Sequence, residues 1–347
     1  MTQLAEKPAA FATALEKRPT GGARWLEDLR SRGAARFAAL GIPTVRDEDW
    51  RFTNVSVLNS VEFAPAGPIS GAAERLHGFA YTDAPVRLVI VNGRFDTTLS
   101  RTKGLPAGVV AGSLAAAITD HADVVQRYFG QLADFTSRSF VALNTAFVQD
   151  GAFVYIPDGV VLDTPIHIVF VSGADAATVM AHPRTLIVAG AGSQARVIES
   201  YIGTTGESYL NNAVSEVFVG ENGSIDHYKV QEESVDAYHI ASLHAHTSRS
   251  SRFSSHSFTL GGRIVRNDAL VLLDGEGGDC TLNGLYLADR ERLVDNHTTI
   301  DHAKAHCGSH EVYKGILGGT SRAVFNGKII VRQDAQKTDA KQTNRAL

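Results

Sequence analysis

The sequence predicts an α+β protein of mainly β structure that begins with a helical part. Apolar residues recur at helical spacing only before about residue 138. From about Phe140 onward, short segments alternate between apolar and polar residues with a period of two. Glycine-rich turns separate these segments, and the chain holds 32 glycines. We therefore expect a mainly helical amino-terminal domain at 1–138 and a β core domain at 139–347.

The amino-terminal part contains two predicted helices. In the range 23–40, apolar residues recur at helical spacing, and Gly41-Ile42-Pro43 ends the pattern. A second helix is predicted over 113–135, because Ser113 is a typical N-cap residue and the apolar residues after it form one stripe.

A short apolar strand is predicted at Val86–Val91, with a turn at Asn92-Gly93. The alternating segments after Phe140 are 195–201, 214–219, 224–230, 242–247 and 251–258. Their turns lie at 158–159, 190–192, 220–223, 261–262 and 275–278. No helical period interrupts this part of the chain, which argues against βαβ units. A sandwich, a barrel and a β-helix all stay open, because the irregular turn spacing demonstrates no coil repeat.

Composition excludes several classes of protein. The net charge of −4 and the pI near 6.3 give no overall attraction to nucleic acid or to a membrane surface. No apolar run reaches the roughly 18–20 residues that span a bilayer, and the amino terminus lacks the apolar core of a signal peptide. Two cysteines form no disulfide framework, so we expect a reducing, cytoplasmic location.

Nucleotide and nucleophile motifs give no catalytic site. Gly190-Ala191-Gly192-Ser193-Gln194-Ala195 fits a dinucleotide fingerprint, but that fingerprint needs a helix after it. The residues that follow alternate like a strand, so we interpret the motif as a turn. The chain contains neither a phosphate-binding loop nor a Gly-x-Ser-x-Gly nucleophile elbow, and no acid–base pair stands out.

Two groups of histidines are candidate metal ligands. His244 and His246 alternate along a strand as in cupin barrels, but the expected glutamate is missing downstream, so a solvated or interface face is the better explanation. The densest group surrounds residue 302 and includes His297. Within it, the candidate ligands for zinc or iron are His302, His306, Cys307 and His310. Their spacing matches no standard metal finger, and a polar strand or turn surface is the alternative.

Several motifs, in the right order along nearly the whole chain, resemble the SufB/SufD family. In the later half they are Val294-Asp-Asn-His-Thr-Thr-Ile-Asp-His302, Gly308-Ser-His-Glu-Val-Tyr-Lys-Gly-Ile-Leu317, Arg322-Ala-Val-Phe-Asn-Gly-Lys-Ile-Ile-Val331 and Asp334-Ala-Gln-Lys-Thr-Asp-Ala-Lys-Gln-Thr-Asn344. Upstream they are Glu48-Asp49-Trp50-Arg51-Phe52-Thr53, Asp150-Gly151, Val154-Tyr-Ile-Pro-Asp-Gly159 and Thr164-Pro-Ile166. The Ala-Val-Phe-Asn-Gly and Ala-Gln-Lys-Thr-x-Ala-x-Gln-x-Asn elements are similar to the SufD branch.

This resemblance implies a helical amino-terminal domain followed by a right-handed parallel β-helix. It implies a non-catalytic scaffold subunit of the SufBCD complex for iron–sulfur cluster assembly, with SufB-like and SufC-like proteins as partners. SufC is the ATPase, so the chain needs no phosphate-binding loop. Pairing of edge strands near the carboxyl ends of two β-helices is implied as well, and it makes the isolated chain a homodimer. No tightly bound cofactor is expected, and a nascent cluster would form only at the interface with SufB.

One departure from the family pattern concerns the carboxyl end. SufD-like chains continue through a Lys-Pro-Gln-Leu-Glu-like strand, a Cys-x-His-Gly motif and a helical domain that docks SufC, whereas this sequence stops at Leu347. We therefore expect a chain shortened relative to the natural protein, and Cys307 does not replace the missing cysteine. Two rival functions stay open: a mononuclear metal protein and a carbohydrate-active β-helix enzyme.

Overall fold

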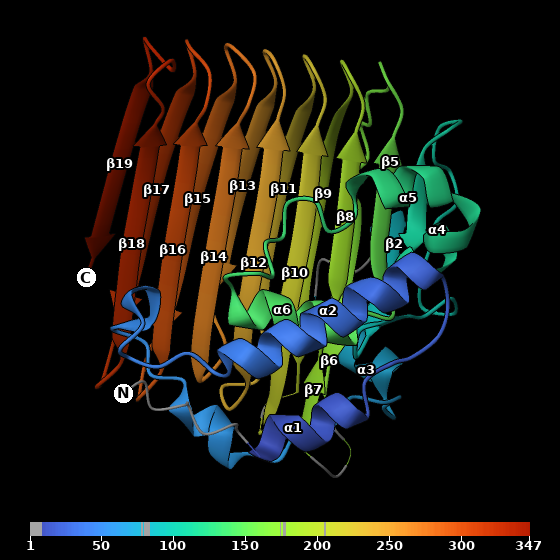
Figure 1. Cartoon of the computed structure of the whole chain (residues 1–347), viewed down its shortest axis with the longest axis vertical. Coiled ribbons are helices and arrows are strands. Elements are labelled where there is room, and N and C mark those ends of the chain that lie inside the picture. The colour runs from blue at the N-terminus through green and yellow to red at the C-terminus, as the bar shows by residue number, and fades with distance from the viewer. Residues whose placement is uncertain (1–8, 78, 80–83, 174, 176–177, 205) are drawn as a thin grey trace.

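The computed structural model describes residues 9–77, 79, 84–173, 175, 178–204 and 206–347. Two facing sheets of mainly parallel strands form a β-helix, and the amino-terminal helices cover the outer face of one sheet (Figure 1). Strands of the covered sheet run upward in the view, those behind run downward, and the coil advances leftward (Figure 1). The coil is therefore right-handed, as parallel crossovers almost always are. The expected fold, a helical amino-terminal part followed by a right-handed parallel β-helix, is confirmed.

The helices of the first 138 residues differ in part from the predicted ones. They are α1 (Ala9–Glu16), α2 (Arg24–Leu40), α3 (Ala72–His77), α4 (Leu114–Asp120) and α5 (Ala122–Tyr128), with 3-10 turns η1 (Glu48–Trp50) and η2 (Ser56–Ser60). The helix expected at 23–40 is confirmed, and Gly41 ends it with a positive φ of 67°. Ser113 is the expected N-cap, since its hydroxyl accepts a hydrogen bond from the Ala116 amide at 3.1 Å.

The single helix predicted over 113–135 is wrong in its extent. The chain breaks at His121 and leaves helical geometry after Tyr128. The end after Tyr128 is explained by a carboxylate from the covered sheet, because Glu216 accepts hydrogen bonds from the amides of Gly130, Leu132 and Ala133. These amides are thereby satisfied without helical hydrogen bonds.

A helix also lies where the sequence predicts only strands. Helix α6 (Ser139–Phe147) interrupts the chain after Phe140, and every residue from Phe140 to Phe147 is buried. A helix that is buried all round has no polar face, so it shows no amphipathic period. Helix α2 crosses it closely, since a Cβ atom added at Gly33 would lie 2.9 Å from the Ala146 amide nitrogen.

The β-helix is built from two sheets. The covered sheet contains, in order from one edge, β18 (Arg322–Val331), β16 (Leu293–His302), β14 (Ile264–Leu273), β12 (Tyr238–Thr247), β10 (Tyr209–Val219), β8 (Arg184–Ala189), β5 (Gly151–Ile156) and β4 (Val110–Ser113), with β7 (Val179–Ala181) and β1 (Ala64–Pro65) at its side. The second sheet contains β19 (Asp339–Ala346), β17 (Gly308–Leu317), β15 (Asp279–Ala288), β13 (Arg252–Thr259), β11 (Ser224–Glu232), β9 (Gln194–Gly203), β6 (Ile166–Ser172), β2 (Val86–Val91) and β3 (Arg94–Phe95).

The predicted strands and turns are confirmed. Strand β2 pairs with β3 through the Asn92-Gly93 turn, and the Gly190-Ala191-Gly192 motif joins β8 to β9 without a helix. Since β2 also pairs with β6, strands of both predicted domains share one sheet. The division at residue 138 stays a prediction.

A coil repeat does exist, and its variable length hides it in the sequence. From β9 onward, paired residues on neighbouring coils lie between 26 positions apart, as Tyr238 and Ile264 do, and 31 apart, as Gly308 and Asp339 do. Each coil turns at the same end through a residue of positive φ, and these residues hydrogen-bond along the stack. They are Gly192, Asn222, Ser250, Gly277 and His306, and each donates its amide to the carbonyl of the turn in the next coil.

Alternate side chains of each strand fill the interior of the coil, which we call the lumen. Apolar lumen residues such as Val197, Ile225, Phe253, Val294 and Ile300 form one continuous core. On the outer face of the covered sheet, Leu210, Tyr238 and Ile240 pack against the helices in a second core. The helices thus bury part of the outer face of the covered sheet. A short amino-terminal segment contacts β14 and β16 on the same face.

Candidate functional site

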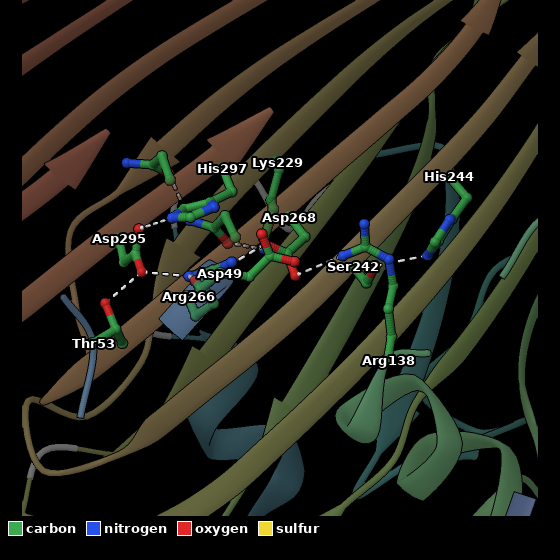
Figure 2. Close-up of polar contacts among 12 residues, drawn as sticks. Asp49, Thr53, Arg138, Lys229, Ser242, His244, Arg266, Asp268, Asp295 and His297 are labelled. Atoms are coloured by element: carbon green, nitrogen blue, oxygen red, sulfur yellow. Dashed lines mark hydrogen bonds and ion pairs between the residues drawn. The ribbon is translucent and has the colours of Figure 1, made fainter. Parts of the chain in front are cut away.

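The segment Arg46–Thr53, called the 46–53 segment below, lies on the outer face of the covered sheet and is held there by Arg266 of β14 (Figure 2). The Arg266 guanidinium donates to the Asp49 carbonyl oxygen at 2.8 Å, to Asp268 Oδ1 at 2.7 Å and to Asp295 Oδ2 at 2.6 Å. Its Cζ atom also lies 4.6 Å from the centre of the Trp50 ring. One buried arginine therefore joins the segment to two strands of the β-helix.

Asp295 is the second anchor of this cluster. It accepts a hydrogen bond from the Thr53 hydroxyl, and its Oδ1 lies 3.1 Å from His297 Nε2. Burial alone would raise the pKa of Asp295, but the hydrogen bond from His297 and the charge of Arg266 lower it below its ordinary value. The carboxylate is thus ionised and fully engaged, so the cluster acts as a structural clamp.

A groove of about 300 Å³ lies between the 46–53 segment, the start of α6 and the outer face of β12 and β14. Part of its floor is apolar, with Trp50, Phe140 and Ile240 among the lining side chains. The charged residues Asp47, Glu48, Asp49, Arg138, Arg266 and Asp268 line it as well. It offers a partly apolar, charged recess of the size that small ligands or single side chains occupy.

The lumen holds a buried charged network that the sequence analysis missed. Glu199 accepts hydrogen bonds from Tyr201 at 3.0 Å and Ser215 at 2.9 Å, and Glu233 Oε2 lies 2.6 Å from His239 Nδ1. Lys229 donates to Asn267 Oδ1 at 2.6 Å. The alternation of apolar and polar residues along β11 could have identified Lys229. It has the same parity as the buried Ile225 and therefore points into the lumen.

Burial and neighbouring charges set the protonation of this network. Burial lowers the pKa of Lys229 to about 8. Burial alone would raise the pKa of Glu199, but the hydrogen bond and charge of His227 lower it to about 2. Two carboxylates therefore share the interior with one ammonium at neutral pH, an arrangement that is costly unless its partners stay in place.

The four candidate metal ligands are not brought together. His302 is buried in the lumen, where its Nε2 lies 2.9 Å from Ser309 Oγ, whereas His310 is exposed on the outer face of β17. His306 occupies the positive-φ turn position, and its Nε2 lies 3.7 Å from Glu276. Cys307 is buried, which raises the pKa of its thiol, and Sγ lies 3.3 Å from the Gly275 carbonyl oxygen.

Across the residues that the structure describes, no three or more His, Cys, Asp and Glu side chains are grouped so that they could hold a metal ion. Metal binding by His302, His306, Cys307 and His310 therefore stays a prediction, and turn geometry explains the position of His306 by itself.

Of the solvated or interface face expected at His244 and His246, the solvated alternative is wrong for His244. Helix α6 and the segment before it cover this part of β12, so His244 is only 3% exposed. Its Nε2 lies 2.7 Å from Ser242 Oγ, and burial lowers its pKa to about 4. His246 is half-buried, and its Nε2 lies 3.3 Å from Asp274.

The last coil presents unpaired edges. In the described part of the chain, β18 pairs only with β16 and β19 pairs only with β17. The amides of Arg322 and Arg332 donate to β16 and its flanking residue, and alternate residues of a parallel strand direct their amides to opposite sides. The amides of Ala323, Phe325, Gly327, Ile329 and Val331 therefore point to the open side, where another strand can add.

Among the residues described, no helix is long and apolar enough to cross a membrane.

Comparison with known proteins relates both parts of the chain to one system. A model of the SufBD core domain of the SUF system for iron–sulfur cluster assembly matches residues 170–347, and a model of the SufBD amino-terminal region matches residues 11–168.

Individual relatives agree with these matches. The SufBD family protein slr0076 of Synechocystis is 32% identical over 331 residues, which cover 93% of this chain and 73% of the relative. The iron–sulfur cluster assembly protein SufD of Escherichia coli is 29% identical over 88% of this chain and 70% of its own length. SufD of Bacillus subtilis is 26% identical over 93% of this chain and 75% of its own length.

Proposed function

This chain belongs to the SufBD family of iron–sulfur cluster assembly proteins, and from that membership we propose that it is a scaffold subunit without catalytic activity of its own. Its partners are a SufB-like protein and, in the complete protein, a SufC-like ATPase. The chain acts in the cytoplasm, and it forms a homodimer when no SufB-like protein is present.

The observation that carries this proposal is that β18 and β19 each pair on one side only in the described part of the chain. A stack of coils pairs the main-chain groups of each coil with those of the next, so the edges of β18 and β19 can each accept a further strand. Strands β18 and β19 lie side by side at one end of the β-helix (Figure 1). A SufB-like β-helix adds its own strands there and continues the sheets across the interface.

The charged groups of the chain favour a structural role over a catalytic one. Asp295, Arg266, Glu199 and Glu233 each contact partners within the fold. The clamp of the 46–53 segment and the lumen network therefore stiffen the scaffold. The nascent cluster forms at the interface with the SufB-like protein, and this chain holds no tightly bound cofactor.

The experiment is co-expression of the chain with the SufB-like protein of the same source, followed by affinity purification and mass photometry. Ile329→Pro removes an edge amide but spares the β16 ladder, since Ile329 has the opposite parity to Arg322. We expect this variant to lose most of the complex. Lys328→Ala, on the same strand, is the matched control and should retain it.

Full retention of the SufB-like protein by Ile329→Pro would contradict pairing through the edge. Failure of the unaltered chain to bind either partner would contradict the scaffold function itself.

A further inference from the structure

The groove beside the 46–53 segment is electrostatically polarised. Its acidic side is made by Asp47, Glu48 and Asp49, which are all exposed. Its basic side is the start of α6, where Arg138 Nη1 lies 3.6 Å from Asp268 Oδ2. Because Asp268 offsets the charge of Arg138 there, the charge left for a bound segment to meet is that of the acidic side.

The arginines of the groove do not neutralise its acidic side. Arg266 is fully buried and already engaged by Asp268, Asp295 and the Asp49 carbonyl oxygen. Figure 2 shows Arg138 directed toward Asp268, with which it forms an ion pair. Among the described residues, no hydrogen bond or ion pair engages the side chain of Glu48, so its carboxylate can meet an incoming cation.

The floor of the groove suits the aliphatic part of a bound side chain. Phe140 and Ile240 are at most 5% exposed and form a fixed apolar surface. Trp50 packs against Phe140 with ring centres 5.3 Å apart, and Arg266 covers one face of its indole. A lysine or arginine can lay its methylene stem on this floor and keep its charged end in water beside the carboxylates.

From this charge complementarity we propose that the groove docks a peptide segment of a partner protein, with apolar residues on the floor and a lysine or arginine against Glu48 and Asp49. The volume of about 300 Å³ accommodates two or three side chains. The lining of the groove includes no residue of β18 or β19, so the groove gives the chain a second docking point that is separate from the edge strands.

The test uses defined probes and the emission of Trp50. Acetyl-Leu-Leu-Lys-amide and acetyl-Leu-Leu-Glu-amide are titrated into the purified chain at low ionic strength. We expect saturable binding of the lysine peptide, at least tenfold tighter than the glutamate peptide, and a loss of this preference in 0.5 M NaCl. Trp50→Phe should abolish the signal and leave the emission of Trp25 unchanged.

Charge reversal at one position identifies the acidic side. Glu48→Lys should reverse the preference between the two peptides. Asp334→Lys, an exposed carboxylate in the turn between β18 and β19, is the matched control and should keep the original preference.

Equal binding of the two peptides, or an unchanged preference in Glu48→Lys, would overturn the proposal. Spermidine binding as tightly as the lysine peptide would also overturn it, because the groove would then take small amines. None of these results depends on the SufB-like or SufC-like proteins, so this inference and the scaffold function fail separately.

Discussion

The hydroxyl of Thr53 donates a hydrogen bond to the carboxylate of Asp295, a residue 242 positions later in the chain. Both residues are about 1% exposed. The contact joins two segments that carry family resemblance, the 46–53 segment and the start of β16. The amino-terminal segment is thus a fixed part of the β-helix surface, and it forms one wall of the groove.

Removing this hydrogen bond should loosen the segment. Thr53→Ala leaves a buried carboxylate with one partner fewer, so we expect the free energy of unfolding to fall by about 2 kcal/mol. Thr53→Ser keeps a hydroxyl and should lose less than half as much. Urea unfolding followed by circular dichroism measures both, and equal stability of Thr53→Ala and the unaltered chain would refute the clamp.

A second prediction concerns close packing between β15 and β17. A Cβ atom at Gly284 would lie 2.2 Å from the Tyr313 ring, and one at Gly315 would lie 2.1 Å from the Tyr286 ring. Each glycine therefore makes room for a tyrosine of the neighbouring strand. We expect Gly284→Ala to destabilise the chain by about 1–3 kcal/mol.

A double variant tests whether Tyr313 causes this loss. Gly284→Ala combined with Tyr313→Leu should cost less than the two single changes together, because the obstructing ring is gone. Thermal unfolding of the three variants gives the comparison, and simple additivity would show that the two residues are not coupled.

Acidification should unfold the chain through its buried histidines. Burial lowers the pKa of His182 to about 3 and that of His244 to about 4, whereas an unfolded histidine titrates near 6.5. Below pH 6.5 these histidines bind protons in the unfolded chain but stay neutral in the folded chain. The free energy of unfolding therefore falls as the pH falls. Each histidine should cost about 2 kcal/mol between pH 7 and pH 5.

His244→Gln removes one of these titrations. Its stability should change less between pH 7 and pH 5 than that of the unaltered chain, by about 2 kcal/mol, in urea titrations at each pH. His310→Gln, on an exposed residue, is the control. Parallel pH profiles for His244→Gln and the unaltered chain would contradict the burial of a neutral His244.

Lys229 gives a prediction at alkaline pH. Burial lowers its pKa to about 8 against about 10.5 in the unfolded chain, so the folded chain releases its proton first. Stability should therefore rise between pH 8 and pH 10.5, by about 3 kcal/mol relative to Lys229→Met, in which this titration is absent. Urea unfolding of the two chains across this pH range measures the difference between their free energies of unfolding. If that difference stayed constant with pH, the burial of Lys229 would be contradicted.

Local patterns predict much of this fold but not its three-dimensional contacts. Period-two alternation identifies strands such as β11 and β13, because each presents one face to the lumen. It fails at α6, whose residues from Phe140 to Phe147 are all buried and so carry no period. The coil repeat escapes detection because the turns vary in length while the strand register stays fixed.

At the candidate site, too, local sequence patterns do not predict which distant residues come together. The cluster of histidines near residue 302 suggests a metal site by composition, yet strand parity places His302 inside and His310 outside. The cluster that the fold does assemble joins Asp49, Thr53, Arg266 and Asp295, and no spacing rule relates residues so far apart. Parity could have identified Lys229 as a lumen residue, since it follows the buried Ile225 by four positions.

The central claim is tested most directly by reconstitution of the complete assembly. The protein, a SufB-like protein and a SufC-like protein are purified together and supplied with iron, sulfide and a reductant under anaerobic conditions. The scaffold account predicts a ternary complex that develops an iron–sulfur absorption band, with no such band on this subunit alone. A band on this subunit alone, or a SufB–SufC pair that develops the band equally well without it, would contradict the account.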